Sequence, residues 1–332
     1  MGMISLKKVV THLIILPLII SNTAIAAIAE AKKNPQQELL IWRVDPKPGS
    51  IYSVYLLGSI HAGKTCQIDS PAFERAFQDA ETVAFEVDSL QDPELLAKES
   101  QRYISQLIRE KGRVLNSSDS LRGILEAETY QLLKEKMAAI DFPLDSFAQL
   151  KPWVFMFAFT SAQIAQTEYK SECGLDFMIT ELSQQENKDI AGLETLDYQL
   201  DKFTDLFISM DTDEISETVL AISQAKSFEQ ISEYINQEFD SLSNNVNSGN
   251  VEQLELTLNN WCQEDPQECE SLLYVRNRNW IPKIEDFLNQ KRDTLVVVGA
   301  GHLVGRQSVI ELLKQQGYKV RRVYNNFRMT EE

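Results

Sequence analysis

Two short apolar runs, one near each end of the chain, lead into the same four-residue pattern. Residues 54–57 (VYLL) precede residues 58–61 (GSIH), and residues 295–298 (LVVV) precede residues 299–302 (GAGH). A short continuous apolar run is typical of a strand that is covered on both faces of a sheet. Glycine lets the backbone turn sharply after such a strand and lets a ligand approach closely. The pattern therefore predicts two buried strands that deliver two histidines to one edge of a shared sheet.

Further runs of β-forming residues complete the predicted sheet. Residues 39–43 and 52–57 flank the turn-forming cluster PKPGS at residues 46–50, which predicts a hairpin. Other strands are expected at residues 82–87, 189–193, 294–298 and 319–324. Because strands gather at both ends of the chain, we expect one mixed β-sheet formed by the N- and C-terminal strands.

The long middle of the chain has helical periodicity. The pattern from about residue 93 to 290 is mainly helical, with a loop expected at residues 241–250. Residues 151–166 are unusually apolar, which predicts a buried helix. The expected fold is therefore α/β (α+β), a single domain over residues 27–332 with a large helical cap at about 93–290. In open α/β sheets, sites gather beyond the carboxyl ends of the strands, and both histidines follow such ends.

The N-terminus is typical of a secretory signal peptide. Lys7 and Lys8 precede an apolar core at residues 9–20, and AIA at residues 24–26 offers a small-x-small cleavage site. The apolar core is too short to span a bilayer, which argues against the alternative of a membrane anchor. We therefore expect residues 1–26 to be removed, and the mature chain to be exported, periplasmic or secreted, without a stable membrane anchor.

The charge balance argues against nucleic-acid partners. The chain has 32 basic and 49 acidic residues, and loss of Lys7 and Lys8 with the signal peptide would make its formal net charge of −17 more negative. DNA binding depends on Lys and Arg side chains that displace phosphate counterions. We therefore expect no nucleic-acid partner. Most of this charge is explained by the solubility of an exported protein, although it also favours cations.

All four cysteines lie in the predicted mature chain. An even number of cysteines in an oxidising compartment predicts two disulfide bonds, for which three pairings are possible. Cys262 and Cys269 are close in sequence, which favours a local bridge and leaves Cys66 to pair with Cys173. A zinc site made from these cysteines is less consistent with the sequence, because no C-x-x-C pair occurs.

His61 and His302 are the only histidines outside the predicted signal peptide. Imidazole is a common ligand of transition metals and a common acid or base near neutral pH. A single Gly-x-x-His tetrapeptide carries little information, because it arises easily and a histidine can simply be hydrogen-bonded in the core. Two such patterns, each after an apolar strand, favour one chemical site.

Four carboxylates are candidates for the same site. Glu86 lies near the end of the strand predicted at residues 82–87, where it could bind a metal or act as a general base. A solvated strand edge is the alternative, and it explains Asp88 better. Glu194 ends another predicted strand and should reach the same rim. Asp176 is a further candidate, although capping of a helix would also explain it.

A basic side chain completes the candidate set. Arg276 lies in a helical segment with Trp280 four residues later, so both should share one face of that helix. A guanidinium directed into the site could hold a substrate carboxylate or stabilise an oxyanion. A surface ion pair is the alternative explanation.

The order of these motifs resembles that of the TraB/GumN family, which includes the TIKI metalloproteases. The motifs run in the order Gly-x-x-His, a strand ending in Glu, Gly-Leu-Asp, Gly-Leu-Glu-Thr, Arg-Asn-x-x-Trp and Gly-x-Gly-His. Gln199 follows Glu194 by five residues, as in that pattern. Each motif alone is weak, but their order and spacing are specific, and the resemblance covers about residues 38–325.

The resemblance implies a metal-dependent hydrolase site in which His61, His302 and Glu86 bind the metal. It also implies catalytic roles for Glu86, Glu194 and Arg276. In TIKI proteins the activity is peptide cleavage supported by manganese or cobalt, and the same ligand types suit zinc or iron. The expected function is an exported hydrolase, a peptidase that acts on a peptide or protein substrate. The alternative is a non-catalytic envelope protein that binds a metal ion, haem or a peptide.

Overall fold

A computed structural model describes residues 36–331, except residues 47, 49–50, 89–91 and 226–227. The described chain forms two compact units, a sheet unit and a helical unit. The sheet unit comprises residues 36–96, 170–199 and 240–331, and the helical unit comprises residues 97–169 and 200–239. The predicted signal peptide, residues 1–26, lies outside the described residues.

The sheet unit contains a seven-stranded mixed sheet with the strand order β4-β3-β5-β2-β1-β6-β7. Its strands are β1 (Ile41–Val44), β2 (Val54–Ser59), β3 (Thr82–Val87), β4 (Asp189–Glu194), β5 (Thr294–Gly299), β6 (Val320–Val323) and β7 (Met329–Glu331). The pairs β3/β4, β3/β5 and β2/β5 are parallel, whereas β1/β2, β1/β6 and β6/β7 are antiparallel. This confirms the predicted α/β fold and the predicted β1–β2 hairpin.

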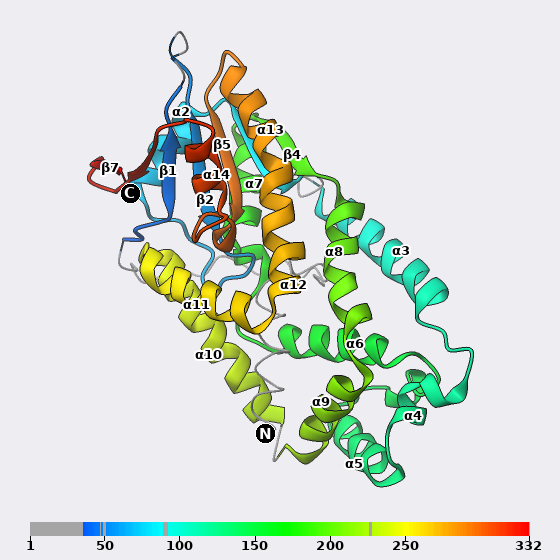
Figure 1. Cartoon of the computed structure of the whole chain (residues 1–332). Coiled ribbons are helices and arrows are strands. Elements are labelled where there is room, and N and C mark those ends of the chain that lie inside the picture. The colour runs from blue at the N-terminus through cyan, green and yellow to red at the C-terminus, as the bar shows by residue number, and fades with distance from the viewer. Residues whose placement is uncertain (1–35, 47, 49–50, 89–91, 226–227, 332) are drawn as a thin grey trace. The chain divides into compact units, whose positions relative to one another are not determined.

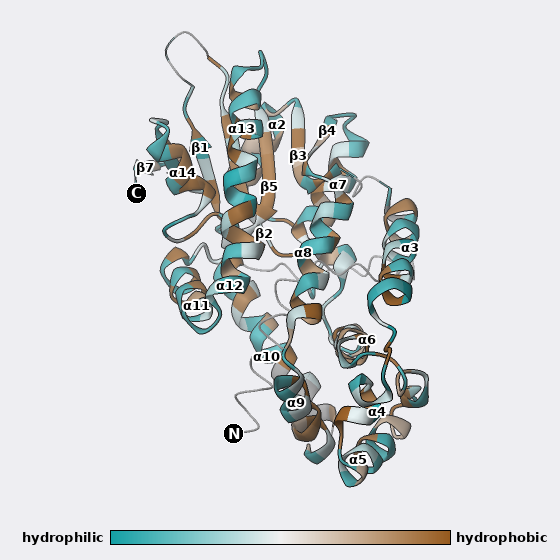
Figure 2. Cartoon of the chain, turned by 45° about the vertical axis from the view of Figure 1, so that its right-hand side comes forward, coloured by the Kyte–Doolittle hydropathy of each residue, from teal (hydrophilic) through white to brown (hydrophobic). Residues whose placement is uncertain are grey.

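The parallel centre of the sheet is covered on both faces. Every residue of β2 and β3 is buried, and β5 is buried up to its last residue. Helices α13 (Val275–Asn289) and α14 (Val309–Gln315) cover one face, and α2 (Pro71–Asp79) and α7 (Leu175–Gln185) cover the other (Figure 1). Hydrophobic residues accordingly predominate along β5 (Figure 2). Burial on both faces explains why these strands lack the alternating pattern of a half-exposed strand.

The sheet unit contains further helical elements. They are the helices α11 (Val251–Glu264) and α12 (Pro266–Cys269), the π-helical turn η5 (Glu270–Tyr274) and the 3-10 turns η4 (Ser171–Cys173) and η6 (Ala300–His302). Turn η5 runs directly into α13, and η6 follows β5 without a gap. Helical segments that switch type in this way frequently lie at functional sites.

The helical unit confirms the predicted buried helix. Its elements are α4 (Leu121–Ile124), α5 (Ala127–Ala138), α6 (Pro152–Ala165), α9 (Thr212–Gln224), η2 (Ser117–Asp119) and η3 (Leu144–Ser146). Phe155 and Phe159 of α6 are buried and stack on each other, and Phe142 meets both rings edge-on. Helices α3 (Pro93–Lys111), α8 (Leu196–Ser209) and α10 (Phe228–Asn247) have residues in both units. None of the helices described is both long enough and apolar enough to cross a membrane.

The loop predicted at residues 241–250 is wrong over most of its length, because α10 continues to Asn247. Val246 is completely buried, and Leu242, one turn earlier, packs against the core of the sheet unit. This pair at helical spacing stabilises the last turns of α10 in spite of the many Ser and Asn residues around it. The short strand β7 was not predicted from the sequence.

Candidate active site

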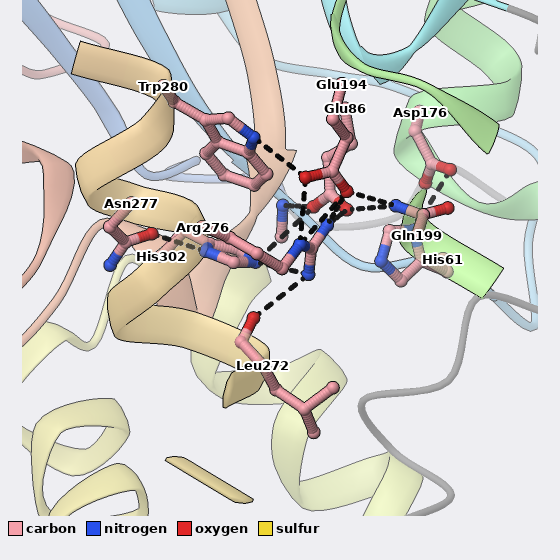
Figure 3. Close-up of polar contacts among 11 residues, drawn as sticks. His61, Glu86, Asp176, Glu194, Gln199, Leu272, Arg276, Asn277, Trp280 and His302 are labelled. Atoms are coloured by element: carbon pink, nitrogen blue, oxygen red, sulfur yellow. Dashed lines mark hydrogen bonds and ion pairs between the residues drawn. The ribbon is translucent and has the colours of Figure 1, made fainter. Parts of the chain in front are cut away.

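The candidate site lies at the carboxyl ends of the parallel strands of the sheet unit. His61 follows β2, Glu86 lies near the end of β3, and Glu194 is the last residue of β4. His302 lies in η6, directly after β5, and Arg276 lies in the first turn of α13. The structure therefore brings all five predicted site residues to one edge of the sheet, where they face one another (Figure 3).

Arg276 lies at the centre of the cluster, and its side chain is only 1% exposed. Its Nη2 lies 2.6 Å from Glu86 Oε2 and 2.6 Å from Glu194 Oε1, and its Nε donates to Glu194 as well. Its Nη1 donates to the carbonyl oxygen of Leu272, in η5, and lies 3.3 Å from His302 Nε2. All five N–H bonds of the guanidinium therefore have partners within the protein.

The surface ion pair considered for Arg276 is thus wrong, since the guanidinium is buried between two carboxylates. The shared helix face predicted for Arg276 and Trp280 is confirmed: the guanidinium carbon lies 4.8 Å from the Trp280 ring centroid. Trp280 Nε1 also donates to Glu194 Oε2 at 3.0 Å. Glu194 therefore has both carboxylate oxygens engaged by α13.

Both carboxylate oxygens of Glu86 accept hydrogen bonds. Its Oε2 accepts from Arg276 and from Gln199 Nε2 at 2.8 Å, and its Oε1 accepts from the Gly299 N–H at 2.8 Å. Burial alone would raise the pKa of Glu86, but Arg276 and the Gly299 N–H hold it well below its usual range. Burial raises the pKa of Glu194, although Arg276 opposes this. Glu86 is therefore the permanently ionised carboxylate of the site.

His302 is buried and neutral. Its Nδ1 lies 2.6 Å from Asn277 Oδ1, and the Asn277 amide nitrogen donates to a carbonyl oxygen, so Nδ1 is the donor. The lone pair is then on Nε2, which lies 3.3 Å from Arg276 Nη1 and 3.7 Å from Glu86 Oε1. Burial and the Arg276 guanidinium lower the pKa of His302 to about 3.

His61 has a different partner and a different charge. Its Nδ1 lies 3.1 Å from Asp176 Oδ2, and the His61 side chain is 19% exposed. Burial alone would lower the pKa of His61, but the charge and hydrogen bond of Asp176 raise it to about 9. The two histidines look equivalent in sequence, yet one is held by a carboxylate and the other by an amide.

Gly299 lies between Glu86 and the two histidines, where even a methyl side chain would be in close contact. A Cβ atom at Gly299 would lie 3.3 Å from Glu86 Oε1, 3.6 Å from His302 Cδ2 and 3.7 Å from His61 Nε2. Any larger residue would crowd Glu86 and the two imidazole rings. The second glycine-histidine motif therefore supplies a histidine and also the room beside it.

The chemistry of these donors suits a divalent cation. Both imidazoles have Nδ1 engaged by an oxygen acceptor, which leaves Nε2 for an ion, as is usual for metal-binding histidines. His61 Nε2 faces Gly299, whereas His302 Nε2 lies 3.3 Å from Arg276 Nη1. In the part of the chain that the structure describes, however, no group of three or more His, Cys, Asp or Glu side chains is arranged to hold a metal ion. The donor atoms are therefore of the right type for a divalent ion, but the described side chains are not spaced closely enough to bind one through three ligands.

Sequence reasoning missed one partner and left another undecided. Asn277 was part of a motif, but nothing local indicated that it would bind His302. Asp176 does not cap α7, whose N-cap is Gly174, and instead holds His61. Asp88 is exposed, in agreement with a solvated strand end.

Two disulfide bonds join the predicted pairs, Cys66–Cys173 and Cys262–Cys269. The first joins the segment after His61 to the segment before Asp176. Gly63 and Lys170 also exchange backbone hydrogen bonds of 3.0 and 2.9 Å between these two segments. The disulfide therefore closes the backbone around the His61–Asp176 pair, and both bonds are compatible with an exported protein.

The His61–Asp176 pair predicts a loss of stability at alkaline pH. Because the folded-state pKa of about 9 exceeds that of an exposed histidine, the stabilisation is fully present below about pH 6.5 and is lost as pH rises through 9. The expected loss is on the order of 2–3 kcal/mol. Urea unfolding at pH 6 and pH 9.5 with a chelator measures it, and Asp176→Asn should remove most of this pH dependence. Identical pH profiles for the wild type and this variant would contradict the pairing.

Comparison with known proteins agrees with the order of the motifs. A family model described as TraB/PrgY/gumN matches residues 40–322, which include every residue of the candidate site. Metalloprotease TIKI2 of Danio rerio is 22% identical over 325 residues, covering 84% of this chain and 60% of the relative, so the chain spans less than two thirds of that relative. No solved structure matches the chain. Since the matched model covers most of its length, the chain belongs to the TraB/PrgY/gumN family.

Proposed function

We propose that this protein is an exported hydrolase that cleaves peptide bonds in a peptide or protein substrate with the help of a divalent metal ion. The observation that carries the proposal is the convergence of His61 Nε2, Glu86 Oε1 and the His302 ring around the position that a side chain of Gly299 would take. Similarity to a relative named as a metalloprotease supports the reaction class. The acidic chain also disfavours nucleic-acid substrates.

His61 and His302 would bind the ion through Nε2, and Glu86 would bind it through Oε1. His302 Nε2 would exchange its 3.3 Å contact with Arg276 Nη1 for the ion. When bound, a divalent ion polarises the carbonyl group and lowers the pKa of a coordinated water molecule. Manganese or cobalt is the ion suggested by the family resemblance, and zinc or iron suits the same donors. Binding requires the proton on His61 Nε2 to leave, so metal affinity should rise with pH up to about 9.

The contacts favour a ligand role for Glu86. A carboxylate whose pKa is held far below its usual range is a weak proton acceptor, so metal binding suits it better than general base catalysis. Glu194 has both oxygens engaged by Arg276 and Trp280. Arg276 donates to both carboxylates through Nε and Nη2, so its role in this proposal is to orient Glu86 and Glu194.

A second candidate function is binding without turnover. It is favoured by His302, which is 3% exposed and has Nδ1 against Asn277 and Nε2 against Arg276. A site closed in this way could hold a metal ion or a peptide as part of an envelope protein. Hydrolysis separates the two functions, because only the first one consumes a substrate.

The test is digestion of a diverse peptide library by metal-stripped protein and by protein loaded with manganese or cobalt, read out by mass spectrometry. We expect metal-dependent cleavage that Glu86→Gln lowers by about 100-fold or more, since it removes a charged ligand. Asp88→Asn, at the same strand end but exposed, is the matched control and should keep full activity. Metal-loaded wild type without cleavage would contradict the proposal, as would full activity of Glu86→Gln.

A further inference from the structure

Ser59 carries a buried hydroxyl group that forms no hydrogen bond with the described residues. It is the last residue of β2, it is 3% exposed, and within the described structure its Oγ has no hydrogen-bond partner. The buried serine Ser183, by contrast, donates to the carbonyl oxygen of Ile179 at 2.7 Å. Leaving a buried polar group unpaired costs about 1–3 kcal/mol, so such a group calls for an explanation.

The strand register places Ser59 beside Gly299. The two residues are partners in the parallel β2/β5 pair, so their side-chain positions lie on the same face of the sheet. The preceding residue, Gly58, faces the other way, since a Cβ there would meet Leu40 and Ala300. Neighbouring strands lie about 4.8 Å apart. A molecule held at Gly299 is therefore within reach of the Ser59 hydroxyl.

A second buried polar atom without a partner belongs to Asp176, the residue that holds His61. Asp176 uses Oδ2 to bind His61 Nδ1, whereas its Oδ1 is buried and has no partner among the described residues. Unpaired polar atoms thus occur on the strand that leads into His61 and on the residue that holds it. Buried polar groups in native proteins are normally paired, so the surroundings of His61 are suited to a polar ligand.

Apart from the N–H at His61 Nε2, which a metal ion would replace, the other donors of the site are engaged. Arg276 donates to Glu194 and Glu86 through Nε and Nη2 and to the carbonyl oxygen of Leu272 through Nη1, and the Gly299 N–H donates to Glu86 Oε1. Gln199 Nε2 donates to Glu86 and also lies 3.3 Å from Glu194. A substrate carbonyl oxygen at Gly299 would need a hydrogen-bond donor, and the Ser59 hydroxyl is a donor with no acceptor.

We propose that Ser59 is a substrate-contacting residue whose hydroxyl donates a hydrogen bond to the carbonyl oxygen of the amide bound at Gly299. The proposal rests on the proposed function for the identity of the substrate as an amide. The hydrogen bond strengthens as negative charge develops on that oxygen, so its effect falls mainly on kcat rather than on KM. Ser59 forms no covalent bond in this proposal.

The chain offers a matched control in Thr294. Thr294 is completely buried, its Oγ1 also lacks a partner within the described residues, and it begins the same strand that Gly299 ends. It is therefore the same kind of group at the opposite end of the same strand. Ser59→Ala and Thr294→Val both remove an unpaired buried hydroxyl, so neither should lower the urea midpoint of unfolding.

The experiment measures kcat and KM for a library peptide with the metal-loaded protein. We expect Ser59→Ala to lower kcat about 100-fold, Ser59→Thr to restore part of it, and Thr294→Val to leave it unchanged. Wild-type kcat in Ser59→Ala would overturn the proposal. An equal loss in Thr294→Val would overturn it too, because the effect would then not be specific to the site.

A binding arm separates this proposal from the proposed function. The phosphinic analogue of Ala-Ala, which carries charged oxygen atoms in place of the amide carbonyl, is titrated into each variant by calorimetry. If the wild type cleaves no peptide but Ser59→Ala weakens this binding at least tenfold relative to Thr294→Val, hydrolysis fails and the Ser59 contact stands. If the wild type neither cleaves peptides nor binds the analogue, or if both variants bind it equally, the Ser59 contact is overturned.

Discussion

Replacement of Arg276 by methionine should lower the free energy of unfolding by about 3–5 kcal/mol, because it leaves two carboxylates buried without their counter-charge. Arg276 lies 2.6 Å from both Glu86 Oε2 and Glu194 Oε1, and neither carboxylate side chain is more than 6% exposed. Methionine fills much of the same volume, so the loss reports charge rather than a cavity. Urea unfolding at pH 7 measures it.

The matched control is Arg278→Met, two residues along the same helix. Arg278 is exposed and forms a surface ion pair with Glu270, so its loss should cost less than about 1 kcal/mol. The deficit of Arg276→Met should also shrink between pH 7 and pH 4. Without the guanidinium, the buried carboxylates of Glu86 and Glu194 should take up protons as pH falls, because burial raises their pKa. In the wild type, Arg276 lowers the pKa of Glu86, so this stabilisation is present above the unfolded pKa of about 4.3 and is lost only as pH falls through the much lower folded pKa. A deficit that is equal at both pH values would show that packing, not charge, is lost.

The sequence predicts the sheet well because its central strands are covered on both faces. Residues 295–298 have no polar residue to interrupt them, and this follows directly from helices on either side of β5. The same reasoning predicted that His61 and His302 lie at one edge, since the carboxyl ends of neighbouring parallel strands meet there. The parallel register of β2 and β5, with Ser59 opposite Gly299, confirms that geometry.

The partners of the two histidines could not be predicted, because they come from distant helices. Asp176 reaches His61 from α7, and Asn277 reaches His302 from α13. The carboxylate of Asp176 raises the pKa of His61 to about 9. His302 has only an amide partner, and burial and the nearby Arg276 lower its pKa to about 3. Two motifs that look alike therefore provide different chemistry, and no local pattern contains that difference.

The burial of Arg276 could not be decided from the sequence either. Helical periodicity places Arg276 and Trp280 on one face, but a charged residue on a helix is most often exposed. Its burial depends on two carboxylates that two different strands, β3 and β4, deliver to the same edge. The sequence also missed the end of α10, where Val246 is buried although asparagine and serine surround it.

The central claim is that His61, Glu86 and His302 form one metal site, and calorimetric titration of the metal-stripped protein with manganese or cobalt tests it most directly. At pH 8 we expect the wild type to bind one ion per chain through the three groups that face Gly299. The double variant His61→Ala, His302→Ala should bind at least about 100-fold more weakly, with circular dichroism confirming that it remains folded. Asp88→Asn, the exposed neighbour of Glu86, should bind like the wild type. Equal affinity in the double variant, or no binding by the wild type, would contradict the claim.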